Sequence, residues 1–232
     1  MNFELTGGTA YPMAVIQMER GDIINIERGA MAYSRNVEIK GRMNSNNRSG
    51  LGGLMSAIGR SITSGESMFI TEATATGNEA ELAVAPSNIG KIEKLTIGVT
   101  QYRLNTGAYL ASDSSVHYNM VRQDVGKAIF AGTGGLFVME TSGTGDLLIS
   151  SFGDIVELTV EPGKPLTVDN EHVLAWSADL DYNIRIASGM FGFTSGEGIV
   201  NEFNGSGIVY VQTRNVRNLA ESLQNYLSNG GK

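Results

Sequence analysis

Gly65-Glu66-Ser67-Met68-Phe69-Ile70 places a glycine directly before an apolar run that is typical of a β-strand. The same arrangement recurs in Gly132-Thr133-Gly134-Gly135-Leu136-Phe137-Val138 and in Gly196-Glu197-Gly198-Ile199-Val200. We call these three stretches the glycine boxes. They stand about 65 residues apart, which is longer than the unit of most open repeat stacks. The sequence therefore predicts three internal repeats that form one closed body.

Composition favours a folded β protein and excludes several kinds of site. The 232 residues contain no cysteine, which excludes disulfides, cysteine metal sites and thiol catalysis and is consistent with the cytoplasm. The net charge of -7 argues against a general nucleic-acid surface. Thirty glycines against four prolines indicate many short strands joined by tight turns. We expect neither a signal peptide nor a membrane-spanning segment, because no long apolar run is present.

The order of strands and turns after each box defines the expected repeats within a single domain, residues 1–232. We assign residues 65–121 to the first repeat, 132–187 to the second and 196–214 to the third. The third repeat is short, and residues 11–43 supply strands in the order that it lacks. We therefore expect residues 11–43 to complete the third repeat, which would close the body and remove exposed sheet edges.

Paired glycine and polar residues mark turns between the expected strands. Gly21-Asp22 reads as a hairpin turn, and Gly77-Asn78 turns the strand Met68–Thr74 back into Ala80–Ala85. Ser142–Gly145 and Asn204–Gly207 are the corresponding turns after the second and third boxes. The pattern predicts pairs of neighbouring strands joined by short loops.

Two helices are expected. Leu54, Ala57, Ile58 and Ile62 are spaced for one face of a short helix near 54–62, after a glycine cluster that lacks the features of a phosphate-binding loop. In the C-terminal helix, residues 215–228, the apolar residues fall on one face, and Asn215 or its neighbour can cap the helix. That face could pack against the β body, make an oligomer contact or lie on a membrane surface. The helix has Arg217 as its positive charge, so we favour packing against the body.

The search for chemistry finds no catalytic constellation. His172 with Asp169 and Glu171 is the most suggestive metal set, but neighbouring residues in extended chain point to opposite faces. The other histidine, His117, sits in an expected strand. We predict no metal site, no cofactor and no catalytic residue.

Glu66 and Glu197 recur in the first and third boxes, where Thr133 stands in the second. Two carboxylates related by the repeats could share a proton, although an acidic residue in a glycine turn more often accepts backbone N–H bonds. We interpret both glutamates as turn residues. The aromatic residues that recur with the repeats could stack on RNA bases, but strand aromatics are more often core. This group consists of Tyr33, Phe69, Tyr109, Phe137 and Phe203.

An ordered set of motifs covers almost the whole chain. It consists of Gly65-Glu66-Ser67-Met68-Phe69, Tyr109-Leu110-Ala111-Ser112-Asp113, Pro162-Gly163, Val168-Asp169, His172-Val173-Leu174-Ala175-Trp176 and Ser195-Gly196-Glu197-Gly198. The set resembles a widespread bacterial family related to the "altered inheritance of mitochondria" biogenesis proteins. The resemblance implies a fold like that of the tryptophan RNA-binding attenuation protein, a short double-stranded β-helix built in repeats. It implies no enzyme activity, cofactor or catalytic residue. Gly132-Thr133-Gly134 departs from the expected Gly-Glu-Gly pattern.

Two hypotheses for function follow. The first is a non-enzymatic scaffold or assembly protein that binds other proteins, itself included, or acts near a membrane surface. The second is a small-ligand or RNA-binding protein, which rests on analogy with the attenuation protein's fold alone. The acidic charge counts against RNA. A cupin-type enzyme is a more distant third.

Overall fold

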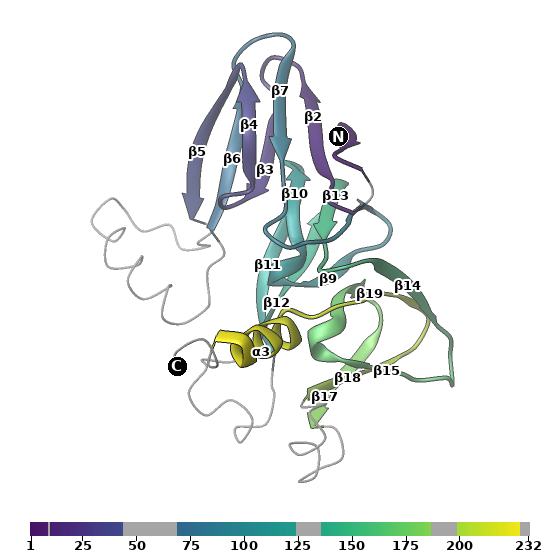
Figure 1. Cartoon of the computed structure of the whole chain (residues 1–232). Coiled ribbons are helices and arrows are strands. Elements are labelled where there is room, and N and C mark those ends of the chain that lie inside the picture. Colours follow the sequence, from purple (N-terminus) through teal and green to yellow (C-terminus); the bar gives the residue numbers. More distant parts are fainter. Residues whose placement is uncertain (9, 44–68, 124–135, 187–198, 228–232) are drawn as a thin grey trace, which may run out of the picture.

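Short strands in several sheets make up most of the structure. A computed structural model of the chain describes residues 1–8, 10–43, 69–123, 136–186 and 199–227. The strands run from β1 (Asn2–Thr6) to β19, and helix α3 (Val216–Leu227) follows the last of them. Figure 1 shows the strands of residues 13–43 and 69–84 in the upper part of the view, and the strands of residues 155–212 and α3 in the lower part. The expected all-β architecture with a C-terminal helix is confirmed.

Eighteen of the strands fall into three consecutive sets of six. The first set is β2 (Met13–Met18), β3 (Ile23–Glu27), β4 (Met31–Arg35), β5 (Val37–Met43), β6 (Phe69–Ala75) and β7 (Ala80–Val84). The second is β8 (Ile92–Ile97), β9 (Tyr102–Asn105), β10 (Tyr109–Asp113), β11 (Val116–Gln123), β12 (Leu136–Gly143) and β13 (Gly145–Ser150), with the 3-10 turn η2 (Thr106–Ala108) before β10. The third is β14 (Ile155–Val160), β15 (Leu166–Asp169), β16 (Val173–Ser177), β17 (Asp181–Ile186), β18 (Ile199–Asn204) and β19 (Gly207–Gln212), with η3 (Asn170–His172) before β16.

Each set has the same antiparallel pairing. The first strand and the third both pair with the sixth, as β2 and β4 do with β7. The second strand and the fourth both pair with the fifth, as β3 and β5 do with β6. The second set and the third repeat this pattern. The pairs β3–β10 and β9–β16 join one set to the next, so the sheets continue across the boundaries between sets.

The expected closure by the N-terminal strands is wrong. β18 and β19 pair with β14 to β17, which precede them directly in the chain. The strands of residues 13–43 pair with β1, β6, β7 and β10. The sheets described by the structure are open, with orders such as β11-β12-β9-β16-β19-β14. The physical reason is that strands before and after a glycine box pair with each other, so each set begins well before its box.

The expected hairpins are also wrong. Gly21 turns with a φ of 95° between β2 and β3, but these strands lie in different sheets and do not pair. The turns after β6, β12 and β18 likewise lead from one sheet to another. They are corners between layers. A glycine turn between two apolar runs signals a change of direction, and pairing partners are decided by the packing of the whole body.

The core consists of three apolar clusters that cross the boundaries between sets. One combines Ile16 and Leu82 of the first set with Leu110 and Leu148 of the second. Another contains residues of all three sets, and the third packs Trp176 and its neighbours of the third set against a strand of the second. Tyr109 and Phe203 are fully buried, as the core interpretation of the aromatic residues predicts, whereas Tyr33 is 39% exposed, so the interpretation is wrong for that residue.

The glycine boxes and their neighbours lie largely outside the described residues. This applies to Glu66, Thr133 and Glu197 and to the short helix expected near 54–62, so the predictions about them stay predictions. The boxes nevertheless have a defined place in the topology. Each falls between the fourth and fifth strands of a set, and these two strands pair with each other.

Candidate functional site

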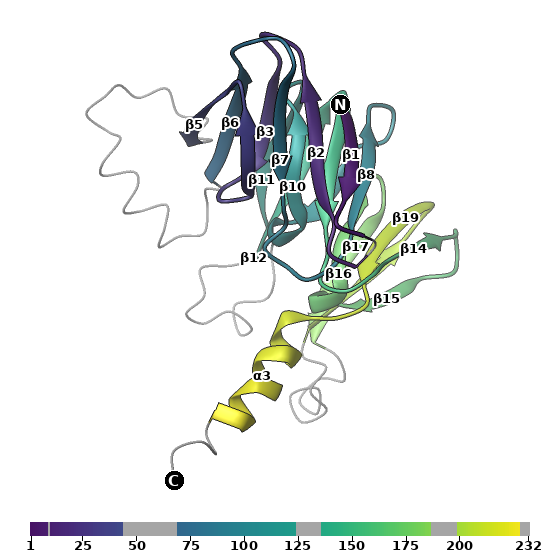
Figure 2. The same ribbon diagram turned by 45° about the horizontal axis from the view of Figure 1, so that its top comes forward.

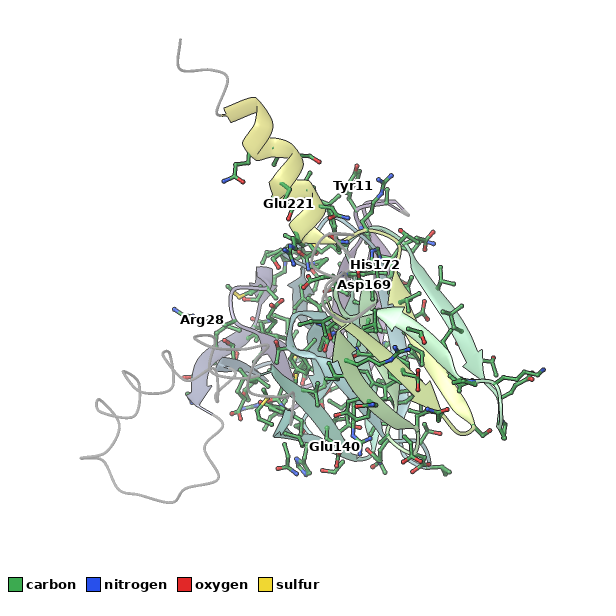
Figure 3. The ribbon with its side chains drawn as sticks, turned by 90° about the horizontal axis from the view of Figure 1, so that it is seen from below. Tyr11, Arg28, Glu140, Asp169, His172 and Glu221 are labelled. Carbon is green, nitrogen blue, oxygen red and sulfur yellow. The ribbon has the colours of Figure 1, made fainter. Side chains whose placement is uncertain are left out.

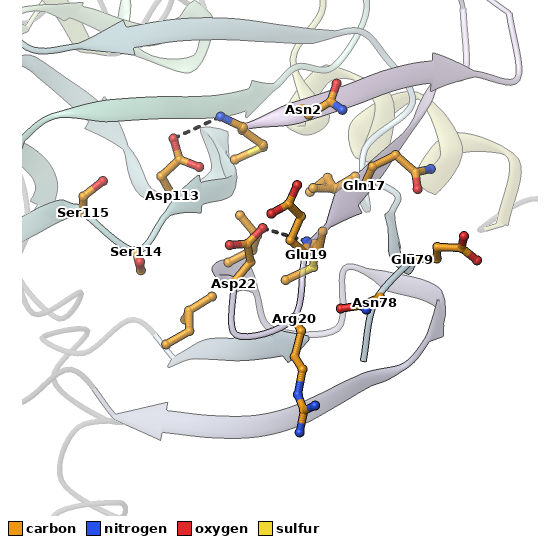
Figure 4. Close-up of a pocket in the computed structure, with 15 residues that line it drawn as sticks. Asn2, Gln17, Glu19, Arg20, Asp22, Asn78, Glu79, Asp113, Ser114 and Ser115 are labelled. Atoms are coloured by element: carbon orange, nitrogen blue, oxygen red, sulfur yellow. Dashed lines mark hydrogen bonds and ion pairs between the residues drawn. The ribbon is translucent and has the colours of Figure 1, made fainter. Parts of the chain in front are cut away.

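Two grooves lined by described residues are candidates for a site. The larger has a volume of about 850 Å³ and is lined by residues of β1, β2, β3 and the ends of β7 and β10. We call it the acidic groove, because its charged side chains are mainly Glu19, Asp22, Glu79 and Asp113 (Figure 4). The smaller, of about 550 Å³, lies where α3 leaves the β body. We call it the helix groove.

Two acids of the acidic groove are engaged in holding the backbone. Asp22 Oδ2 accepts a 2.8 Å hydrogen bond from the Glu19 N–H, which closes the turn after β2. Asp113 Oδ2 accepts from the Asp146 N–H at 2.7 Å and from the Met1 amine at 3.4 Å. Figure 4 shows Asp22 and Asp113 with separate partners, and Asp22 lies in the turn before β3 whereas Asp113 ends β10. The geometry therefore supports a structural role for Asp22 and Asp113.

The floor of the helix groove is built from the junctions between successive sets. Gly153, at the junction that precedes β14, donates its N–H to the Ile89 carbonyl at 2.8 Å. Arg214, in the segment that connects β19 to α3, donates its N–H to the Phe152 carbonyl at 3.2 Å. Ile89 and Phe152 themselves line the groove. Backbone hydrogen bonds thus stack these connecting segments on one another. The stacking brings two large apolar side chains from distant parts of the sequence to one surface.

An ion pair stands beside this stack of junctions. Lys91 Nζ lies 2.6 Å from Asp154 Oδ1, which also accepts the Ile155 N–H at 2.8 Å. The hydrogen bond from Lys91 and that from the backbone hold the pKa of the Asp154 carboxyl below its usual range. The group is exposed, so this pair fixes local geometry more than it stabilises the fold.

A chain of hydrogen bonds connects the β body to α3. His172 Nδ1 lies 2.6 Å from the Gln212 carbonyl oxygen, and a carbonyl can only accept, so Nδ1 carries the proton. His172 Nε2 is then the acceptor for Asn215 Nδ2, at 3.0 Å. Asn215 Oδ1 accepts the Asn218 N–H at 2.8 Å, which is an N-cap at the start of α3. Asn215 is buried, so its two side-chain bonds orient the first turn of the helix.

This arrangement separates His172 from the acids next to it in sequence. Asp169 Oδ1 accepts the Glu171 N–H at 2.8 Å and caps η3. The Glu171 side chain is exposed. In the part of the chain that the structure describes, no three histidine or acidic side chains are grouped as metal ligands would be. His117 is exposed on β11, remote in sequence and pairing from His172.

Beyond its cap, α3 projects from the β body with its apolar face uncovered. Figures 2 and 3 show the helix extending away from the strands, with His172 and Asp169 near its base and Glu221 along it. Every described side chain from residue 216 to 224 is exposed. Val216, Leu219 and Leu223 are 50%, 40% and 51% exposed. The expectation that this face packs against the body is wrong, because the helix leaves the body at its first turn.

The apolar face and the helix groove form one continuous surface. Leu219 belongs to both, since it lines the groove beside Ile89 and Phe152 and shares the helix face with Val216 and Leu223. Arg217 and Glu221 lie on the opposite face and pair with each other at 3.1 Å. The predicted cap at Asn215 is confirmed, but its link to His172 had no signal in the sequence.

Comparison with known proteins places the chain in a family. A family model described as Mitochondrial biogenesis AIM24 matches residues 3–214. The chain belongs to this family. The matched range ends just before Asn215, so α3 follows it. The family resemblance read from the motifs is confirmed, whereas the likeness to the attenuation protein's β-helix stays a prediction.

Two relatives from Streptococcus pyogenes are similar over nearly their whole length. An uncharacterized protein of serotype M6 is 46% identical over 229 residues, which cover 98% of this chain and 91% of that protein. A crystal structure of an S. pyogenes protein, solved as a structural genomics target, has a TM-score of 0.80 and 43% identity and covers 97% of this chain and 99% of its own. Neither description names an activity, ligand or partner for these AIM24 relatives.

Proposed function

We propose that this AIM24-family protein is a non-enzymatic scaffold or assembly protein that binds other proteins through α3 and the helix groove. The observation that carries this proposal is the exposed apolar face of α3, formed by Val216, Leu219 and Leu223. An amphipathic helix docked in a groove, or a surface that receives one, is a recurrent mode of protein recognition. Contiguous apolar surface of this kind on a folded protein usually marks an interaction site.

The way the helix is attached supports the same reading. The bonds from Gln212 through His172 to Asn215 fix the first turn and so give the exposed face a definite direction. A helix that is held at one end and bare along its length presents its apolar residues without first having to detach from the body. Preorganisation of this kind reduces the entropy lost on binding.

Charge identifies the chemistry of the partner surface. The only charged side chains on α3, Arg217 and Glu221, neutralise each other on the face away from the apolar residues. An apolar patch on another protein therefore fits this face better than an anionic lipid or nucleic-acid surface, which would require clustered Lys or Arg.

We also propose a cytoplasmic location, which the lack of cysteine in the whole chain supports. Within the described residues, no helix combines the length and the hydropathy that a membrane crossing requires.

The test compares two double variants of the helix. Leu219→Ser with Leu223→Ser removes the apolar face, and Arg217→Ser with Glu221→Ser changes the opposite face by the same number of residues without altering net charge. Tagged wild type and both variants are used to capture proteins from an extract of the producing cells. Captured proteins are identified by mass spectrometry, purified and titrated calorimetrically.

We expect the apolar variant to lose at least about tenfold in affinity, because truncation of central apolar anchors commonly costs more than 1 kcal/mol each. The polar-face variant should bind as the wild type does. Equal binding by all three proteins would show that the apolar face of α3 is not the binding surface.

A further inference from the structure

Strand β14 ends a six-stranded sheet with one edge uncovered in the described structure. It pairs with β19 from Ile155 opposite Gln212 to Val160 opposite Gly207, without a register shift. The order β11-β12-β9-β16-β19-β14 gives it no second neighbour. Figures 1 and 2 both place β14 on the outside of the molecule. An edge of this kind is a template for another strand.

The direction of the free backbone groups follows from the hydrogen bonds. The Thr213 N–H donates to the Asp154 carbonyl at 3.0 Å, so residue 154 faces β19. Alternate residues of a strand face the same neighbour, and the unshifted register carries this alternation through β14. The N–H and C=O groups of Ile155, Glu157 and Thr159 therefore point to the open edge.

The equivalent strands of the other two sets have protected edges. β2 is covered by β1, which pairs with it from Asn2 opposite Gln17 to Thr6 opposite Met13. β8 carries the exposed charges of Glu93 and Lys94, and charged side chains discourage a strand from pairing with another chain. β14 has Glu157 as its single charge, and its Val156 is 40% exposed. Of these three strands, β14 alone has an edge that, in the described structure, is neither covered by another strand nor flanked by two charged residues of its own.

We propose that β14 pairs antiparallel with β14 of a second copy of the chain, with Leu158 opposite Leu158. In an antiparallel pair, the side chains of opposed residues lie on the same face of the sheet. A symmetric dimer must therefore place one residue of β14 opposite the same residue of the second copy, with the two-fold axis between them. Two registers overlap most of the strand, centred on residue 157 or on residue 158. The first sets Glu157 against Glu157, which like charge disfavours.

The register centred on residue 158 places compatible side chains opposite each other. Val156 lies opposite Val160 of the second copy, which covers the exposed Val156 side chain. Glu157 lies opposite Thr159 of the second copy, and both of these residues direct their backbone groups to the open edge. The pairing therefore forms hydrogen bonds without breaking any bond to β19. The two six-stranded sheets become one continuous sheet.

A matched pair of proline variants tests the proposal in the full-length protein. Thr159→Pro removes an N–H that points to the open edge of β14, so the pairing with β19 is kept. Thr96→Pro is the control, because Thr96 holds the same position in β8 and also points away from its partner β13. Sedimentation velocity over a range of protein concentrations gives the dimer dissociation constant, and circular dichroism verifies that each variant is folded.

We expect the wild type and Thr96→Pro to dimerise with increasing concentration and Thr159→Pro to stay monomeric. The proposal is overturned if the wild type is monomeric throughout, or if folded Thr159→Pro dimerises as the wild type does. Loss of dimer in the Leu219→Ser, Leu223→Ser variant with retention in Thr159→Pro would also overturn it, because the interface would then be α3.

Charge at position 159 tests the register even if proline disturbs the strand. Thr159→Lys places a positive charge opposite Glu157 of the second copy, and Thr159→Glu places a negative one there. Each change occurs twice in the symmetric dimer. The dissociation constant should fall for lysine and rise for glutamate, each by about two- to thirtyfold. Identical dissociation constants for the two variants would exclude this register.

Discussion

His172 and Asn215 show how two polar side chains determine where a helix can be used. The side-chain oxygen of Asn215 accepts the Asn218 N–H, and its amide nitrogen donates to His172. One buried side chain therefore both caps α3 and connects it to the β body. The helix then continues with no described side chain of residues 216–224 buried. The position of the proposed binding face therefore depends on this one residue more than on packing along α3.

Asn215→Ala should loosen the first turn of α3. The change removes both side-chain bonds, and loss of an N-cap typically costs about 1 kcal/mol. Hydrogen exchange of the Asn218 amide should accelerate roughly fivefold, as expected for that loss. Asn215→Asp is the control, because it keeps the oxygen that caps the helix. Unchanged exchange in the alanine variant would mean that the cap does not hold the helix.

At the scale of elements, the junctions between sets do more than connect strands. The junction at Gly90 pairs in parallel with that at Gly153, and Gly153 in turn lies against Thr213 and Arg214. Three turns that are far apart in sequence are thereby stacked, and the helix groove lies on this stack. The groove is a consequence of the order of the strands, since no single element contains it.

Gly90→Ala should disrupt this stack. A Cβ at Gly90 would lie 2.1 Å from the Ser151 carbonyl oxygen and 2.6 Å from that of Gly153, and backbone atoms cannot turn aside as a side chain can. We expect a loss of about 3 kcal/mol in the free energy of unfolding, measured by urea denaturation. Gly98→Ala is the control, because a Cβ there meets nothing within 4 Å. A loss below about 1 kcal/mol at Gly90 would contradict the close approach.

The elements also show what the sequence could and could not predict. The strands after the boxes were predictable, because their apolar runs are bounded by glycine turns, and β18 begins at the expected Ile199. The helix and its cap at Asn215 were predictable for similar local reasons. The pairing of the strands was not predictable, because a glycine turn such as that at Gly21 has the same sequence whether it joins two paired strands or leads from one sheet to another. Nor was the groove, because it depends on contacts between residues more than 60 positions apart, such as Ile89 and Gly153.

At the scale of the whole molecule, the three sets share their apolar clusters and two of their sheets, so we expect them to unfold together. Each apolar cluster combines residues of at least two sets, as Leu82 and Leu148 share one cluster. Two strand pairs, β3–β10 and β9–β16, also cross the boundaries between sets. Trp176, the only tryptophan of the chain, is buried in the third set and packs 5.6 Å from Phe203 between ring centroids. Its fluorescence therefore reports on the part of the protein farthest in sequence from the N-terminal strands.

We predict that a destabilising substitution in the first set lowers the stability measured at Trp176, in the third set, by its full amount. Leu82→Ala removes a fully buried side chain from the first set, which should cost about 2–5 kcal/mol. If the chain unfolds as one domain, urea midpoints from Trp176 fluorescence and from far-UV circular dichroism will fall together by the same free energy. Leu5→Ala, at a half-exposed leucine of β1, should leave both midpoints nearly unchanged. If the Trp176 midpoint is unchanged while the circular dichroism curve shows two steps, the third set folds alone. The continuous sheets and shared apolar clusters would then contribute little to the free energy that couples the sets.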